Sequence, residues 1–170
     1  MNGDRSFTII EMLVAVAIFT LVMGMATGIF VSALRVQRQS LASQQLLDQT
    51  SYLMEYMSRA IRMAKKDMSG VCTGTLKSNY GFAGQCLKFV NYKDGCQQFC
   101  LDGERLKDQD GNYLTSPSLK VKDFNVNLSG ETQTDDFQPK VTVFLNIEGK
   151  ERSKIKIQTT ISQRNLDIKR

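Results

Sequence analysis

A long apolar window near the N-terminus constrains this chain more than any other feature of its sequence. The window runs from Phe7 to Leu34, and Glu11 is its single charged residue. An α-helix needs about 20 apolar residues to cross a bilayer, and the window exceeds that length. We therefore predict a transmembrane helix over residues 7–34.

The polar segment before the window, residues 1–6, does not belong to a secretory signal peptide. Such a peptide has a shorter apolar core that ends in a small-residue cleavage site, and this window has neither property. We expect residues 1–6 to be a short leader peptide. Its removal would leave the apolar helix on the mature protein.

Glu11 is the informative residue of the window. On insertion scales, placing a carboxylate at the bilayer centre costs about 2.5–3.5 kcal/mol of free energy, and less near the edge. Such residues therefore usually have a partner. Cleavage between Ser6 and Phe7 would create a positive amine on Phe7, about one helical turn before Glu11. We expect this amine to pair with Glu11 of the same chain or of a neighbour in an assembly.

The segment from Ser6 to Phe19, SFTIIEMLVAVAIF, resembles the processing site and helix start of type IV prepilins and type II secretion pseudopilins. In that family a membrane prepilin peptidase cuts before the Phe and methylates its amine, and the Glu pairs with the amine of an adjacent subunit. The resemblance implies N-methylation of Phe7 and assembly roles for Phe7 and Glu11. The family normally has Gly before the cut. Ser6 is also small, so we expect cleavage there.

The helix is predicted to continue beyond the membrane as an amphipathic segment, residues 35–67. Neither proline nor glycine interrupts it, and Ser69-Gly70 is expected to end it. Apolar residues recur along one stripe, which favours packing on a sheet. The stripe consists of Leu47, Met54, Ile61 and Met68, with Thr50, Met57 and Ala64 between them.

Alternating apolar residues predict antiparallel strands in a β region over residues 71–165. Three strands are expected around Phe124–Leu128, Val141–Ile147 and Ile155–Ile161, each with one buried face. The fold class is therefore α+β, with a long N-terminal helix packed on an antiparallel β-sheet meander. Its first half spans the membrane, and its second half belongs to a soluble pilin-like domain, residues 35–170.

Two turns are predicted within the β region. Lys93-Asp94-Gly95 reads as a three-residue hairpin loop with Gly95 in the left-handed position, which pairs Phe89 with Phe99 and Leu87 with Leu101. Asp108–Asn112 faintly resembles a calcium loop, but its spacing departs from the EF-hand pattern, and we interpret it as a turn.

The four cysteines, Cys72, Cys86, Cys96 and Cys100, all follow the apolar window. On the far side of a membrane an even count favours two disulfides, and the absence of histidine weighs against a zinc site. We favour Cys86–Cys100 with Cys72–Cys96. The local pairing, Cys72–Cys86 with Cys96–Cys100, remains the alternative and requires that residues 97–99 form no strand.

The lack of histidine, of a Gly-rich phosphate loop and of HExxH argues against an enzyme, a metal site and a bound cofactor. We expect a structural subunit of a type IV pilus or a type II secretion pseudopilus-like filament, in a minor pilin or pseudopilin role. The resemblance implies other pilin-like subunits, prepilin peptidase and inner-membrane assembly machinery as partners. It also implies a single-pass inner-membrane protein whose C-terminal domain lies outside the cytoplasm before it enters a filament.

Two alternatives remain open at this point. One is a DNA-binding minor pilin at a filament tip, because the formal net charge is +5 and basic residues gather near the C-terminus. Its contacts would be Arg152, Lys154 and Lys156 on one face of the last strand, with Arg164 beyond. No aromatic residues interleave with these charges, although single-strand binding would favour them. The other alternative is a membrane-anchored protein that forms no filament.

Overall fold

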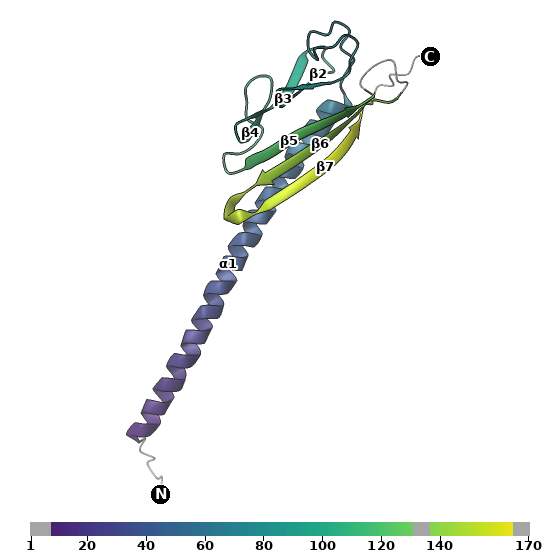
Figure 1. Ribbon diagram of the computed structural model, residues 1–170. Helices are drawn as coiled ribbons and strands as arrows, with labels where there is room; N and C mark the ends of the chain where they lie inside the picture. Colours follow the sequence, from purple (N-terminus) through teal and green to yellow (C-terminus); the bar gives the residue numbers. More distant parts are fainter. Residues whose placement is uncertain (1–7, 131–136, 165–170) are drawn as a thin grey trace. The chain divides into compact units, whose positions relative to one another are not determined.

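The computed structural model describes residues 8–130 and 137–164. The chain divides into two compact units, Met1–Ser40 and Leu41–Arg170, and helix α1 (Ile9–Arg62) supplies residues to both. All of the strands lie in the second unit. The expected α+β class is confirmed (Figure 1).

The C-terminal end of α1 lies at Arg62, not at residue 67 as the sequence pattern predicted. Hydrogen bonds from distant groups add to the last local ones there. The Tyr80 hydroxyl donates a hydrogen bond to the carbonyl of Ile61, and the backbone N–H of Arg164 donates one to the carbonyl of Arg62, both at 2.8 Å. The N–H of Lys65 donates to a strand residue, Val90, rather than to the preceding helical turn.

The buried stripe of α1 in the second unit differs in part from the predicted one. Leu47 is 49% exposed, and Met68 lies beyond the helix end and is 64% exposed, so both assignments were wrong. A strict seven-residue spacing drifts around a helix of 3.6 residues per turn, and the buried face follows the true period. It consists of Ala42, Leu46, Thr50, Leu53, Met57 and Ile61.

The strands form two antiparallel sheets where a single meander was expected, and in both sheets each strand pairs with its neighbours along the chain. The first sheet contains β1 (Gly81–Ala83), β2 (Cys86–Val90), β3 (Cys96–Asp102) and β4 (Arg105–Lys107). The second contains β5 (Lys120–Ser129), β6 (Lys140–Glu148) and β7 (Lys154–Ser162). A short 3₁₀ helix, η1 (Lys150–Arg152), connects β6 to β7.

The core of the second unit lies between α1 and the inner faces of the two sheets. Val143, Leu145 and Ile147 alternate along β6 and are fully or almost fully buried, which confirms the predicted one-sided strands. In the first sheet the rings of Phe89 and Phe99 pack 5.6 Å apart. Figure 1 shows the second sheet lying along the part of α1 that belongs to this unit.

The β2–β3 hairpin has a different register from the predicted one. Leu87 pairs with Phe99, and Val90 pairs with Cys96, so the loop contains residues 91–95. The side chain of Asn91 accepts hydrogen bonds from the N–H groups of Lys93 and Gly95, which stabilises the longer loop. Asp94, with φ 63°, occupies the left-handed position that was assigned to Gly95. The shift by two residues leaves both aromatic rings on one face.

Both disulfides have the pairing that the sequence analysis favoured. Cys86 and Cys100 lie directly opposite each other in the β2–β3 ladder, with Cα atoms 4.1 Å apart. Cys72 is bonded to Cys96 with a Cα distance of 5.4 Å, which ties the loop after α1 to the start of β3. The local pairing is wrong because Cys96 and Cys100 lie along one strand.

The loop over residues 67–78 closes on itself around the side chain of Asp67. Backbone hydrogen bonds join Asp67 to Lys77 and to Ser78, which holds the two ends of the loop together. The buried carboxylate accepts hydrogen bonds from the loop within this ring. The donors are the backbone N–H groups of Ser69, Gly70, Cys72 and Thr73 and the hydroxyl groups of Ser69 and Thr73.

These contacts make folding stability depend on the charge of Asp67. Burial alone raises the pKa of its carboxyl, but the hydrogen bonds, led by the N–H of Thr73 and the hydroxyl of Ser69, outweigh it and hold the pKa well below the usual range. A carboxylate with a lowered folded-state pKa contributes its full stability above about pH 4 and loses it as the pH falls further.

We predict that Asp67→Asn lowers the free energy of unfolding by about 3 kcal/mol near neutral pH, because an amide group would face N–H donors. Urea unfolding of the full chain in detergent, followed by near-ultraviolet circular dichroism, measures the loss. The difference from the unsubstituted chain should shrink below about pH 4. Asp94→Asn, at an exposed carboxylate, is the matched control. Equal effects of the two variants would contradict the prediction.

We predict separate local effects for the two disulfides. Replacing either pair by serine should cost about 3 kcal/mol, because loops of these lengths regain chain entropy in the unfolded state. Removing Cys72–Cys96 should also speed amide hydrogen exchange at Thr73, whereas removing Cys86–Cys100 should leave that exchange unchanged. The prediction fails if both double variants expose the loop to the same degree.

Candidate functional site

The first turn of α1 places Glu11 beside the N-terminal end of the helix. The carbonyl of Thr8 accepts hydrogen bonds from the N–H groups of Glu11 and Met12, and this fixes the helix start. A carboxylate in the first turn is favoured by the positive end of the helix dipole. Within the described residues the Glu11 side chain forms no hydrogen bond or ion pair. Ser6 and Phe7, its expected neighbours, lie outside the described residues.

The apolar residues that follow Glu11 are exposed on every side of the helix. In the part of the chain that the structure describes, α1 is the one helix long and apolar enough to cross a membrane, and none of its most apolar stretch is buried. A helix that is apolar all round is stable only when lipid or other helices cover it. This segment therefore fits a membrane anchor.

The structure does not bring the four predicted nucleic-acid contacts together. Arg152 lies in η1 with a φ of 59°, not on the last strand as expected. Lys154 and Lys156 do project from the outer face of β7, but Lys154 forms an ion pair with Glu148. Lys156 forms no ion pair within the described residues.

Arg164 contributes to a separate basic site at the C-terminal end of α1. It lines an open depression of about 420 Å³ together with Arg59 and Arg62. Arg59 forms an ion pair with Glu55, which also lines this depression. The basic residues of the C-terminal region therefore form two surfaces rather than one.

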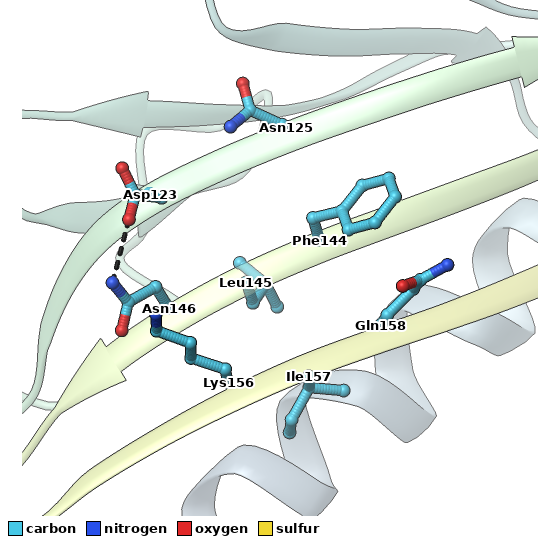
Figure 2. A pocket seen from close by; sticks show the side chains of 8 residues that line it. All are labelled: Asp123, Asn125, Phe144, Leu145, Asn146, Lys156, Ile157 and Gln158. Atoms are coloured by element: carbon cyan, nitrogen blue, oxygen red, sulfur yellow. Dashed lines mark hydrogen bonds between the residues drawn. The ribbon is translucent and has the colours of Figure 1, made fainter.

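The outer face of the second sheet carries a depression that the sequence analysis missed. Its volume is about 580 Å³, and its lining residues come from all three strands (Figure 2). One cross-strand row contains Asn125, Phe144 and Gln158, and the adjacent row contains Asp123, Asn146 and Lys156. Figure 2 shows the hydrogen bond of 2.8 Å that Asn146 donates to the Asp123 carboxylate. The outward positions of the predicted strands were the signal that would have indicated this site.

The acidic turn after β4 confirms the interpretation of residues 108–112. The carboxylate of Asp108 accepts hydrogen bonds from the backbone N–H groups of Asp110 and Asn112, as in an ordinary Asx turn. Among the described residues, no group of His, Cys, Asp and Glu side chains is arranged to hold a metal ion.

Comparison with known proteins identifies a motif in the N-terminal segment. No curated protein and no solved structure matches the chain. The family model described as the prokaryotic N-terminal methylation motif matches residues 1–27, which include the predicted leader, the Ser6–Phe7 junction and Glu11. Residues 1–27 therefore carry the prepilin-type signature of type IV pilins, and this signature supports a type IV pilin-like precursor of the kind that prepilin peptidase processes.

Proposed function

We propose that the mature protein is a structural subunit of a type IV pilus or a type II secretion pseudopilus-like filament, in a minor pilin or pseudopilin role without catalysis of its own. The observation that carries the proposal is the carboxylate of Glu11, which has no hydrogen-bond or ion-pair partner among the described residues. It lies in the first turn of a helix whose apolar surface is exposed all round. Packing such helices side by side covers the apolar surface. It also gives Glu11 access to neighbouring chains.

Assembly follows from the chemistry of this helix start. Prepilin peptidase removes residues 1–6 and methylates the new amine of Phe7. The amine and Glu11 of an adjacent subunit then neutralise each other in a dry filament core, where either charge alone would be costly. The processed subunits form a pool in the inner membrane, from which the assembly machinery extracts them.

The second unit fits a location outside the cytoplasm. Two disulfides form and persist in an oxidising compartment such as the periplasm or the cell surface. The cysteine-bearing sheet and the size of the unit favour a minor subunit over the bulk subunit of a filament.

Processing gives the first test of this proposal. We predict that protein isolated from assembled filaments begins at Phe7 and carries an N-methyl group, which intact-mass measurement detects. Ser6→Gly should speed cleavage in a time course of precursor conversion, because the family normally has glycine there. Filaments that retain residues 1–6 would contradict the proposed processing, whereas an uncleaved chain found in the membrane alone would support a membrane-anchored protein that forms no filament.

Glu11 gives the second test. We predict that Glu11→Gln leaves membrane insertion intact but lowers incorporation into filaments roughly tenfold or more, because the amine of a neighbour loses its partner in a dry environment. Fractionation into membrane and sheared filament, followed by quantitative immunoblotting, measures both quantities. Glu55→Gln, at an exposed carboxylate on the same helix, is the matched control. Equal incorporation of the two variants would overturn the pairing.

A further inference from the structure

The outer face of the β5–β6–β7 sheet holds an aromatic ring where alternation predicts a polar side chain. Val143 and Leu145 of β6 point into the core, so Phe144 between them points outward, and it remains 37% exposed. Its cross-strand partners on this face are Asn125 and Gln158, both polar. The ring therefore lies among amide side chains with one surface accessible to a ligand (Figure 2).

The amide groups around this ring are available for recognition. The side chains of Asn125 and Gln158 form no hydrogen bond within the described residues, so each offers free donors and a free acceptor. Asn146 donates one hydrogen bond to the Asp123 carboxylate, and its side-chain carbonyl oxygen remains available as an acceptor. A flat ligand placed on Phe144 would meet hydrogen-bonding groups along its edges.

The lysines of this face favour a polyanion, and they outnumber the one carboxylate that lines the depression, Asp123. Lys120 and Lys122 share one carboxylate, Glu104, and the hydrogen bond from Lys122 is the main reason that the pKa of Glu104 is lowered to about 2. Lys156 lines the depression and has no acidic partner among the residues that the structure describes. Lys140, at the start of β6, likewise forms no ion pair there.

We propose that this face binds single-stranded nucleic acid, with a base stacked on Phe144 and a phosphate held by Lys156. Every base can stack on an aromatic ring, so stacking needs no particular nucleotide sequence. In such sites a basic groove of the protein follows the phosphate backbone. A duplex keeps its bases stacked inside the helix and cannot present one to the ring. The depression of about 580 Å³ lies within the usual range of ligand sites. A neutral saccharide also stacks on aromatic rings, but it gains nothing from the free lysines.

This proposal is independent of filament assembly, because none of its residues belongs to the apolar helix. It also differs from the four-residue basic surface expected from the sequence. Of that set it retains Lys156, and it adds the aromatic residue that the surface lacked.

The test measures binding of the full chain in detergent to a labelled short oligothymidine by fluorescence anisotropy over a range of salt concentrations. Phe144→Ala should weaken binding roughly 5- to 150-fold, the usual range for loss of a base-stacking ring, and should leave the salt dependence unchanged. Lys156→Gln should reduce the slope of log affinity against log salt by about 0.7, the value of one phosphate contact on a single strand.

Matched controls separate the site from general surface effects. Tyr92→Ala removes another exposed aromatic ring, and Lys77→Gln removes another exposed lysine, so neither should change affinity beyond about twofold. Phe144→Tyr keeps a stacking ring and should retain binding, which distinguishes lost stacking from lost folding. Equal effects of Phe144→Ala and Tyr92→Ala would overturn the proposal. Tighter binding of a duplex, or competition by a neutral saccharide alone, would do the same.

Discussion

Hydrogen bonds at the C-terminal end of α1 hold together the parts of the second unit that lie farthest apart in the sequence. The last carbonyl groups of any helix lack helical partners, and leaving one buried and unpaired costs about 1–3 kcal/mol. Here Tyr80, just before the first sheet, caps Ile61, while Arg164, just after the second sheet, caps Arg62. The side chain of Gln163 adds a bond to the carbonyl of Ala64. The helix end therefore gains its hydrogen bonds from outside the helix only when both sheets are in place.

This dependence explains which elements the sequence was able to predict. The strands β5, β6 and β7 followed from alternation alone, because each buries one face against the core. The helix end did not, because apolar spacing continues to Met68 while groups outside the helix decide where it stops. The hairpin register failed for a similar reason: the side chain of Asn91 stabilises a longer loop than the Asp94-Gly95 signal indicates.

The two candidate sites also differed in how far the sequence alone could predict them. Glu11 was found because a single charge in an apolar helix is unusual in itself and needs no tertiary information. The face around Phe144 depends on how three strands align. A register irregularity between Val121 and Asp123 lets Lys122 and Asp123 both face outward. As a result Asp123 pairs with Asn146, and Asn125 pairs with Phe144, on the outer face of the sheet. No pattern along one strand reveals such an alignment.

The two proposed sites also differ in how strongly salt affects them, and this difference separates their roles. A charge pair in a dry helical core is poorly screened, so the proposed assembly through Glu11 would tolerate changes in ionic strength. Contacts between exposed lysines and phosphates release bound counterions, and their affinity falls steeply as salt rises. A filament built from these subunits would therefore stay assembled across salt concentrations at which the outer sheet face binds or releases a nucleic acid. Ligand exchange on the second unit needs no change in the apolar segment, because no lining residue of the sheet depression comes from α1.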